Sequence, residues 1–314
     1  MRVFSAEETR DLLPFGALIE ALREMFRAGA SAPLRHHHAI ALDGQPDAAL
    51  LLMPAWNPAG LGGVKIVNVN PGNAAAGIPS VSSSYLLFDA KTGRHLAALD
   101  GGELTDRRTA ATAALAASYL APADARQLLV VGAGRVAANL ADAFRAVRPI
   151  EDVTVWNINA ENAERLARRL NGAGFRAAAA KDLEAAVADA DIISCATLAI
   201  DPLIAGAWLR PGQHLDLIGS FRPHMREADD AAVRRARVYI DTEGALKESG
   251  DIIGPIRSGA LTEEAIVGDL TGLCRGTVAG RGGEQEITLF KSSGSALADL
   301  GAATLAHTNF GEDA

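Results

Sequence analysis

Apolar positions in the first third of the chain change from helical to strand-like spacing. A Ser5-Ala-Glu-Glu8 capping box predicts a short first helix. Apolar residues at helical spacing predict a second helix that begins at Pro14 and stops at Gly29. Beyond it, short apolar runs broken by turn residues predict an antiparallel or mixed sheet. These runs are RHHHAIAL (35–42), AALLLM (48–53), GGVKIVNV (62–69), VSSSYLLF (81–88) and RHLAAL (94–99).

The rest of the chain alternates short apolar runs with segments long enough for helices. A helix of small residues is predicted from Thr105 to Leu120, where Pro122 ends it, and another within residues 292–308. Strands separated by helices predict an α/β fold with a doubly wound parallel sheet, preceded by a smaller α+β domain. The strands of this sheet are predicted at residues 127–131, 153–156, around 175–180, 191–196, 214–219 and 237–241.

Composition and charge limit the partners that the protein can bind. Apolar residues make up 49% of the chain, as in ordinary globular proteins. The net charge of −8 argues against nucleic acid or an anionic membrane as a partner, so an anionic ligand needs a local cluster of cations. The chain has only two cysteines and no apolar run of membrane-spanning length, and its start resembles no signal peptide. We therefore expect a cytoplasmic protein.

A glycine fingerprint lies where the first parallel strand meets its helix. LLVVGAGRVAANLADAF places Gly132-x-Gly134-x-x-Ala137 directly after an apolar run. The first glycine allows a tight turn, the second lets backbone approach a pyrophosphate, and the small third residue lets helix and strand pack closely. The alternative is a glycine turn with a structural role only. Because strand, turn and helix are in register, the pattern favours dinucleotide binding.

The end of the next strand bears on the choice of cofactor. An NAD-selective site usually has an acid about 20 residues after the fingerprint, to bind the ribose hydroxyls. Here the candidate is Asn157, which is neutral and would not repel a 2′-phosphate. NADP(H) is therefore favoured, and NAD(H) is the alternative cofactor. A purely structural role for Asn157 is to cap the helix that begins near Glu161.

Three cations in the sheet-forming part of the chain are candidates for an anion-binding site. They are Arg35, Lys65 and Arg108, which the pattern places at strand ends or at a helix start. Lys65 lies within the apolar run VKIV, which is an unusual place for a charge. The alternative for each is a surface side chain whose charged end reaches water. Arg107 is adjacent, and spacing alone does not choose between it and Arg108.

Three consecutive histidines raise the question of a metal site. On a strand, His36 and His38 share one face and His37 the other. Zinc sites need at least three protein ligands, and this arrangement supplies two. We therefore predict no metal and interpret the histidines as part of a solvated strand edge.

An ordered series of motifs along the whole chain resembles one known family. The chain contains, in order, KIVNVNPGNAAAGIPSV, LDGGELTDRRTAA, VVGAGRVA, IGSFRPHMRE, ALKESGD and ITLFKSSGSALAD. This series resembles the ornithine cyclodeaminase/mu-crystallin family. The resemblance implies a homodimer with two domains. Residues 1–121, completed by 295–314, would bind substrate and dimerise, and residues 122–294 would form a Rossmann NAD(P)-binding domain.

The resemblance also implies roles for individual residues. Lys65 and Arg108 would bind the substrate carboxylate, and the T-x-x-R-T motif favours Arg108 over Arg107. Arg35 is the expected third contact, and Ser80, Ser293 and Phe221 would also lie against the substrate. The expected contacts with the cofactor are Ser80, Arg108, Gly132, Gly134, Arg135, Val136, Asn157, Asn159, Thr197, Ser220 and Ser292.

The segment from Gly219 separates two activities of the family. Cyclodeaminases of this family resemble G-A-D-x-P-G-K-x-E-L here, whereas this chain has Phe221 at the aspartate position. Cyclodeamination needs positioned proton transfer, which phenylalanine does not supply. Reduction of a protonated C=N depends mainly on orientation, and the pattern resembles the ketimine-reductase branch. We therefore predict NAD(P)H-dependent reduction of Δ1-pyrroline-2-carboxylate or Δ1-piperideine-2-carboxylate to L-proline or L-pipecolate.

Several alternatives stay open on the sequence. The activity could be that of an ornithine cyclodeaminase or an alanine-type amino-acid dehydrogenase, or the chain could be a non-enzymatic, NADP-loaded protein that binds a small ligand. The sequence does not choose between five- and six-membered rings or between the two reaction directions. His224 could relay a proton, although a solvent-facing turn residue is the simpler interpretation.

Overall fold

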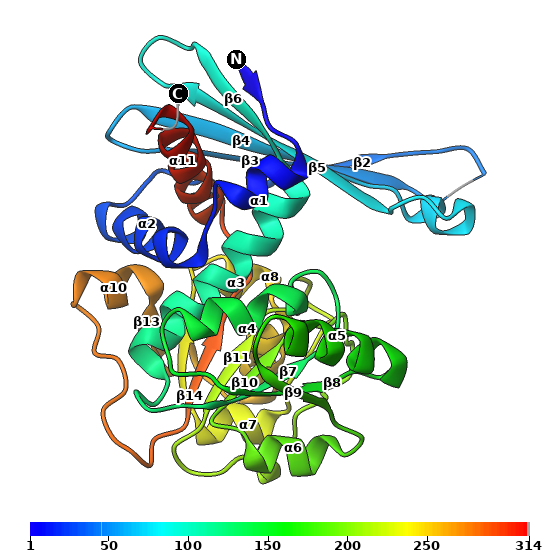
Figure 1. The fold of residues 1–314 in the computed structure, drawn as a ribbon, viewed down its shortest axis with the longest axis vertical. Helices are drawn as coiled ribbons and strands as arrows, with labels where there is room; N and C mark the ends of the chain where they lie inside the picture. The colour runs from blue at the N-terminus through cyan, green and yellow to red at the C-terminus, as the bar shows by residue number, and fades with distance from the viewer. Residues whose placement is uncertain (45, 313–314) are drawn as a thin grey trace. The chain divides into compact units, whose positions relative to one another are not determined.

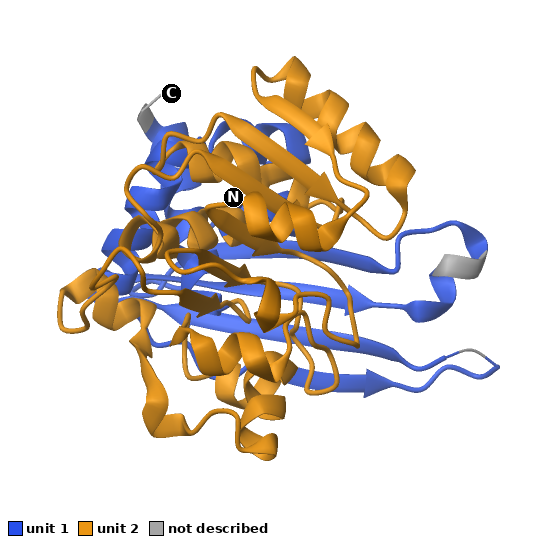
Figure 2. Cartoon of the chain, turned by 90° about the horizontal axis from the view of Figure 1, so that it is seen from below, with its two compact units in different colours: residues 1–108, 295–314 blue, residues 109–294 orange. Residues whose placement is uncertain are grey.

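The chain folds into two units, each with its own sheet. A computed structural model describes residues 1–44 and 46–312 (Figure 1). Unit 1 contains Met1–Arg108 and Ser295–Ala314, and unit 2 contains Thr109–Gly294 (Figure 2). The division falls inside helix α3 (Gly101–Leu120), earlier than the boundary predicted after Ala121. The fold class is α/β, as predicted.

Unit 1 is built on a mixed six-stranded sheet in the order β1-β6-β5-β4-β3-β2. β1 and β6 are parallel, and all the other neighbouring pairs are antiparallel. The five runs predicted from the sequence are all strands of this sheet. The strands are β1 (Arg2–Val3), β2 (His36–Ile40), β3 (Ala48–Trp56), β4 (Leu61–Val69), β5 (Val81–Asp89) and β6 (His95–Asp100), with a 3-10 helix, η1 (Pro71–Ala76), between β4 and β5.

Helix α11 (Ala296–Glu312) covers the inner face of this sheet and contacts β3, β4, β5 and β6. It also packs on α2 (Phe15–Ala28) (Figure 1). The two helices are close together, because a Cβ added at Gly301 of α11 would lie only 3.1 Å from the Leu22 side chain of α2. The predicted capping box is present at α1 (Ala6–Asp11). The last helix of the chain therefore completes the core of the first unit, although 267 residues lie between the end of α2 at Ala28 and the start of α11 at Ala296.

Helix α3 begins four residues before its predicted start at Thr105. Its first residue is Gly101, directly after Asp100 at the end of β6. The Asp100 carboxylate accepts a hydrogen bond of 2.7 Å from the Glu103 amide, which is the usual role of an N-terminal cap. In unit 2, the guanidinium of Arg148 donates to carbonyl groups at the other end of the same helix, including those of Ala117 and Ala121.

Unit 2 is a doubly wound sheet of eight parallel strands in the order β13-β12-β14-β11-β10-β7-β8-β9. Six of them were predicted. β13 and β14, each only four residues long, were not predicted. The strands are β7 (Gln127–Val131), β8 (Asp152–Trp156), β9 (Arg176–Ala179), β10 (Ile192–Cys195), β11 (His214–Leu217), β12 (Arg237–Ile240), β13 (Ile266–Asp269) and β14 (Thr288–Lys291).

The helices of unit 2 connect its parallel strands, as right-handed crossovers require. They are α4 (Ala137–Arg145), α5 (Ala160–Gly172), α6 (Leu183–Asp189), α7 (Asp230–Arg235), α8 (Ala245–Glu248), α9 (Gly250–Ser258) and α10 (Leu270–Arg275), with 3-10 helices η2 (Gly206–Trp208) and η3 (Glu263–Ala265). Among residues 1–44 and 46–312, none of the helices combines the length and apolar character needed to cross a bilayer.

Candidate functional site

Lys65 lies on the buried face of the sheet of unit 1. It occupies the middle of β4, not a strand end, and only 3% of its surface is exposed. Met53 on β3 and Tyr85 on β5 flank it in register, and both are buried. The Lys65 side chain therefore does not reach water in the way that the surface interpretation required. Burial of an ammonium needs compensating partners.

Those partners come from two helices. The Lys65 ammonium lies 3.0 Å from Oδ1 and 2.9 Å from Oδ2 of Asp299 on α11, and 3.3 Å from the Thr105 hydroxyl on α3. Arg108, also on α3, donates from Nε to Oδ1 of Asp299 at 2.8 Å. Asp299 is fully buried and Arg108 is 5% exposed. Strand and helices thus place two cations on one carboxylate.

The electrostatics of this cluster follow from its burial. Burial lowers the pKa of Lys65 to about 8; Asp299 opposes the shift, and Arg108 and Arg35 add to it. Burial alone would raise the pKa of Asp299, but Arg108 and Lys65 outweigh it and the pKa is lowered. Asp299 therefore stays ionised, and the cluster carries one more positive than negative charge while Lys65 is protonated. One surplus charge suits one carboxylate of a ligand.

The structure distinguishes Arg108 from its neighbour. Arg107 donates from Nε to the carbonyl of Leu13 at 2.8 Å and stacks 4.2 Å from the centre of the Phe15 ring. It anchors the segment between α1 and α2, whereas Arg108 faces Asp299. The two arginines thus occupy different sides of α3, and Arg108, which the motif favoured, is the one that joins the cluster with Lys65 and Asp299.

The other predicted substrate contacts of unit 1 are less enclosed. Arg35 precedes β2, is partly buried, and lies close enough to influence the pKa of Lys65. Ser80 precedes β5 and is also partly buried; its carbonyl accepts a hydrogen bond of 2.8 Å from the Asn70 amide. The structure thus relates Arg35 to the cluster by charge, and the substrate contact expected of Ser80 stays a prediction.

The glycine fingerprint has the geometry of a dinucleotide site. Gly132 ends β7 with a φ of 114°, and a Cβ there would lie 2.6 Å from the carbonyl oxygen of Ala196. A Cβ at Gly134 would meet no atom within 4 Å, so this position faces open space. Ala137 begins α4 and is buried. Strain at the first position, space at the second and close packing at the third fit a bound pyrophosphate.

Two asparagines after β8, Asn157 and Asn159, form the turn that leads into α5. Asn159, not Asn157, caps α5, because its side chain accepts from the Asn162 amide. Asn157 donates from Nδ2 to the carbonyl of Asn159 at 3.0 Å. The capping interpretation of Asn157 is therefore wrong. Among the candidates around the fingerprint, Arg135 is exposed and Val136 partly buried at the start of α4.

A buried glutamate connects the loops after β10 and β11. Glu227 accepts hydrogen bonds from the Thr197 amide and hydroxyl, both at 2.8 Å, and from the Gly219 amide at 2.6 Å. Its own amide donates to Asp251 at 2.8 Å. Burial raises the pKa of Glu227 above its usual range. The Thr197 amide and hydroxyl and the Gly219 amide thus hold the Glu227 carboxyl group, which fixes the loops that follow β10 and β11.

Two serines predicted to contact the cofactor, Ser220 and Ser292, form hydrogen bonds within unit 2. The Ser220 hydroxyl is fully buried; it donates to the carbonyl of Met225 at 2.5 Å and accepts from the Asp251 amide at 3.2 Å. At the end of β14, the Ser292 hydroxyl donates to Asp241 at 3.2 Å. These hydroxyls hold loops in the structure, and the cofactor contacts expected of Ser220 and Ser292 stay predictions.

Asp241 is the residue that organises the end of β14. Its carboxylate accepts from the amides of Ser293 and Gly294 at 2.9 and 2.8 Å, and from the Ser293 hydroxyl at 3.3 Å. Asp241, Glu227 and Asp299 were not among the site residues predicted from the sequence. For Asp299 a signal was present, because it is the single charged residue between Ala296 and Ala306.

Exposed apolar side chains gather at the carboxyl ends of the parallel strands of unit 2. Ile158 follows β8, Leu198 and Ile200 follow β10, and Phe221 follows β11. Their exposed fractions range from 41% for Phe221 to 91% for Ile158. This edge is where open α/β sheets bind ligands, and apolar side chains there suit the flat rings of a dinucleotide. His224, in the same loop as Phe221, is exposed, as the simpler interpretation predicted.

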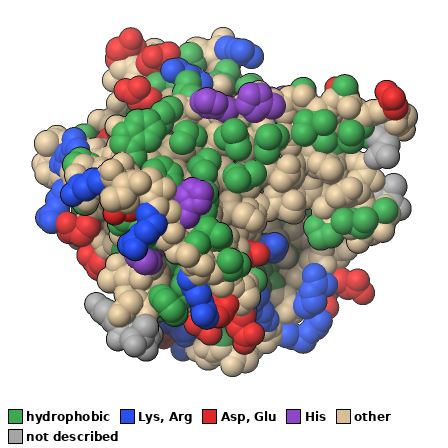
Figure 3. Space-filling view, turned by 90° about the horizontal axis from the view of Figure 1, so that it is seen from above, with side chains coloured by type: hydrophobic (Ala, Val, Ile, Leu, Met, Phe, Trp, Pro, Cys, Tyr) green, Lys and Arg blue, Asp and Glu red, His purple; other side chains and the backbone are tan. Residues whose placement is uncertain are grey.

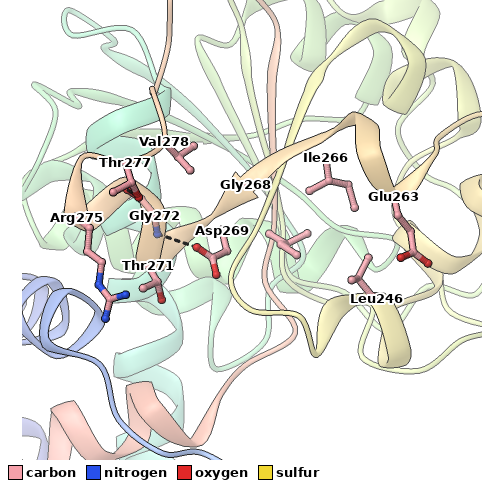
Figure 4. A pocket seen from close by; sticks show the side chains of 11 residues that line it. Leu246, Glu263, Ile266, Gly268, Asp269, Thr271, Gly272, Arg275, Thr277 and Val278 are labelled. Atoms are coloured by element: carbon pink, nitrogen blue, oxygen red, sulfur yellow. Dashed lines mark hydrogen bonds between the residues drawn. The ribbon is translucent and has the colours of Figure 1, made fainter.

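The histidine run belongs to β2 of unit 1, and a cavity with a different lining belongs to unit 2. β2 is an exposed edge strand on which the rings of His36 and His38 are 6.4 Å apart. A cavity of about 440 Å³ lies beside β13 and α10, lined by Glu263, Asp269 and Arg275 among others (Figure 4). The Asp269 side chain there caps α10 by accepting from the Gly272 amide at 2.7 Å. None of the predicted site residues lines this cavity.

Comparison with known proteins agrees with this geometry. The model of the ornithine cyclodeaminase/mu-crystallin family matches residues 2–313. The chain belongs to this family. The resemblance noted in the sequence is thereby confirmed for family and fold, and the family assignment covers both the cation cluster of unit 1 and the fingerprint of unit 2.

Individual relatives within the family cover almost the whole chain. It is 45% identical to a Δ1-pyrroline-2-carboxylate reductase of Paracoccus denitrificans, with 90% of this chain and 88% of the relative covered. A solved structure of the Thermococcus litoralis Δ1-pyrroline-2-carboxylate reductase, in complex with NADH and L-proline, is 34% identical and covers 100% of this chain and 98% of its own, with a TM-score of 0.93. An archaeal alanine dehydrogenase dimer with bound NAD is 26% identical, with a TM-score of 0.91 and coverage of 100% and 97%.

Substitution of the two fingerprint glycines should affect stability and nucleotide binding separately. Gly132→Ala should lower the free energy of unfolding by roughly 1–3 kcal/mol or more, because a side chain is strained at its φ and meets Ala196. Gly134→Ala should keep wild-type stability but weaken nucleotide binding about tenfold, since its Cβ enters the space that a pyrophosphate needs.

Urea denaturation and calorimetric titration with the nucleotide measure the two effects. Gly172→Ala, at the end of α5 with open space around it, is the matched control and should change neither. Unchanged nucleotide affinity in Gly134→Ala would contradict the assignment of the fingerprint.

Proposed function

We propose that this protein reduces a cyclic imino acid with NAD(P)H. The substrates are Δ1-pyrroline-2-carboxylate or Δ1-piperideine-2-carboxylate, and the products are L-proline or L-pipecolate. The observation that carries the proposal is the buried pair of cations, Lys65 and Arg108, in a chain that also has a complete dinucleotide fingerprint. The relatives from P. denitrificans and T. litoralis, the second described with NADH and L-proline, support this choice of substrate.

The chain's own residues contribute mainly orientation and charge. Arg108 and Lys65 bind the carboxylate of the imino acid, with Arg35 as the third contact. The ammonium of Lys65 has three N–H donors, of which Asp299 and Thr105 accept two, so the third is available to the substrate. When bound, NAD(P)H supplies a hydride to the imine carbon. Lys65, while protonated, keeps a proton beside the imine nitrogen, and the fixed orientation lowers the barrier.

Phe221 favours reduction over cyclodeamination. It stands at the position where cyclodeaminases of the family have an aspartate, and its ring is partly exposed at the end of β11. A phenyl ring exchanges no proton, but it forms an apolar wall for a five- or six-membered ring. The amino-acid dehydrogenase alternative keeps the carboxylate-binding cations and differs in requiring free ammonia. The likeness to the archaeal alanine dehydrogenase makes it the second candidate.

NADPH is the proposed cofactor, with NADH as the alternative. Gly132, Gly134 and Arg135 would hold the pyrophosphate, and Asn157 and Asn159 would face the ribose. No carboxylate side chain occupies residues 157–160, where it would repel a 2′-phosphate. Thr197 and the loops that Glu227 and Asp241 fix would border the nicotinamide, with Ser293 and Ser80 beside the substrate.

A homodimer is the proposed assembly. The outer face of the sheet of unit 1 carries apolar rows on adjacent strands, with Leu52 opposite Ile66, and Val64 opposite Leu86. These side chains are only partly buried, and hydrophobic side chains spread across the face seen in Figure 3. An apolar sheet face of this kind suits a second copy, and the archaeal alanine dehydrogenase is described as a dimer.

These assignments give each part of the chain the role that was expected from the sequence. Residues 1–121 with 295–314 would bind the substrate and dimerise, and residues 122–294 would bind the nucleotide. A cytoplasmic location stays a prediction from composition.

The activity is tested by following NADPH consumption with both imino acids. We expect turnover without added ammonia, and no reaction with L-ornithine and NAD. Lys65→Met and Arg108→Met should each lower kcat/KM about 10- to 100-fold and raise KM, because each removes a charge-assisted hydrogen bond that orients the substrate. Lys91→Met, at an exposed lysine, is the control and should behave as wild type. Dependence on ammonia would identify an amino-acid dehydrogenase, and tight binding without turnover a binding protein.

Cofactor preference is tested with Asn157→Asp. A carboxylate at this position should lower kcat/KM for NADPH relative to NADH by roughly tenfold, because it repels the 2′-phosphate. Initial rates with both cofactors at fixed imino acid measure the ratio, and the KM for the imino acid should not change. An unaltered ratio would place the 2′-phosphate elsewhere.

Association is tested with Ile66→Lys, which puts a charge in the apolar rows of the outer sheet face. Sedimentation should change from dimer to monomer, since an unpaired lysine is costly in an apolar interface. Ala185→Lys, at an exposed position of α6, should leave the dimer intact. A wild-type protein that sediments as a monomer would remove the proposed assembly.

A further inference from the structure

We propose that Asp299 is a positioning residue that fixes both the geometry and the charge state of the Lys65–Arg108 pair. It belongs to α11, the last helix of the chain. As an anion it would not itself bind the carboxylate of the substrate. Its functional consequence rests on the proposed imino-acid reduction. The inference deepens that proposal because it identifies what keeps two buried cations ready for one substrate carboxylate.

The geometry supports this role. Both carboxylate oxygens of Asp299 are used, with Lys65 Nζ 3.0 and 2.9 Å away and Arg108 Nε 2.8 Å from Oδ1. The three residues come from β4, α3 and α11, so the carboxylate connects elements that are distant in sequence. All three side chains are at least 94% buried. A carboxylate held in this way determines where each cation points.

The charge balance supports it as well. Without Asp299, the buried site would hold two like charges that repel each other in a medium of low polarity. Lys65, unlike arginine, can relieve this repulsion by losing its proton. A neutral Lys65 would attract a carboxylate weakly and would hold no proton beside an imine nitrogen. Asp299 therefore keeps Lys65 protonated at neutral pH.

Neighbouring charges around Lys65 act in the expected directions. Burial is the largest influence and brings the Lys65 pKa to about 8; Asp299 raises it, whereas Arg108 and Arg35 lower it. Tyr85, which flanks Lys65 on β5, is buried, and burial first and Asp299 second raise the pKa of its phenol, so it stays neutral. Removal of Asp299 should thus shift Lys65 toward its neutral form, and removal of Arg108 should do the opposite.

The test follows the lysine directly by NMR of protein labelled with ¹³C at the lysine ε-carbons, with Lys65→Met assigning the signal. In wild type the Lys65 signal should titrate near pH 8. In Asp299→Asn its pKa should fall by about one unit or more. In Arg108→Met it should rise. Glu103→Gln, which breaks the Arg10–Glu103 ion pair near the start of α3, is the matched control and should leave the titration unchanged.

Each outcome bears on the proposal. An unchanged Lys65 titration in folded Asp299→Asn would overturn it. Loss of the buried carboxylate leaves two buried cations without a counter-charge, which is strongly destabilising, so this variant can fail to fold. In that case Arg108→Met, which leaves Asp299 with Lys65 as its charged partner, decides the matter, because a pKa that does not rise contradicts the charge coupling.

A kinetic measurement connects the same residue to function. The rate of imine reduction should decline as pH rises through the Lys65 pKa, since Lys65 loses its proton there. In Asp299→Asn this decline should begin at a pH about one unit lower. The NMR titration needs no turnover, so an inactive protein would contradict the proposed function while the titration still tests the role of Asp299.

Discussion

The burial of two cations against a single carboxylate is the constraint on which the rest of this structure depends. Charged groups leave water only when other charges and hydrogen bonds replace their hydration. Lys65 and Arg108 satisfy this condition through Asp299, and Thr105 adds a further contact to Lys65. Since these residues belong to β4, α3 and α11, the site forms only when the last helix of the chain returns to the first sheet.

In unit 2, buried acidic side chains accept hydrogen bonds from backbone amides and so hold loops in place. Glu227 joins the loops that follow β10 and β11, and Asp241 fixes the turn that follows β14. In both places the carboxylate accepts backbone N–H groups that have no partner within a strand. Such bonds hold loops at the carboxyl ends of parallel strands, where open α/β sheets bind their ligands. The hydroxyls of Ser220 and Ser292 also take part in this support.

The two units differ in what they offer to the proposed reaction. In that proposal, unit 1 offers an anion the surplus positive charge of Lys65 and Arg108, and unit 2 offers a dinucleotide glycine backbone, neutral asparagines and exposed apolar side chains. Phe221 fits this division, because a reductase of an already electrophilic imine needs orientation more than a further acid or base. Membership of the ornithine cyclodeaminase/mu-crystallin family is consistent with the same separation of tasks.

The sequence by itself determined the features that depend on local patterns. Hydrophobic periodicity located five of the six strands of unit 1, all but β1, and six strands of unit 2. The motifs identified the family, the fingerprint and the cation pair. Tertiary structure decided what depends on contacts distant in the chain. It inserted β14 between β11 and β12, gave helix α3 its start at Gly101, and separated the side of Arg108 from that of Arg107. It also gave Asp299 its role, because the partners of a buried charge are chosen by the fold and not by its neighbours in sequence.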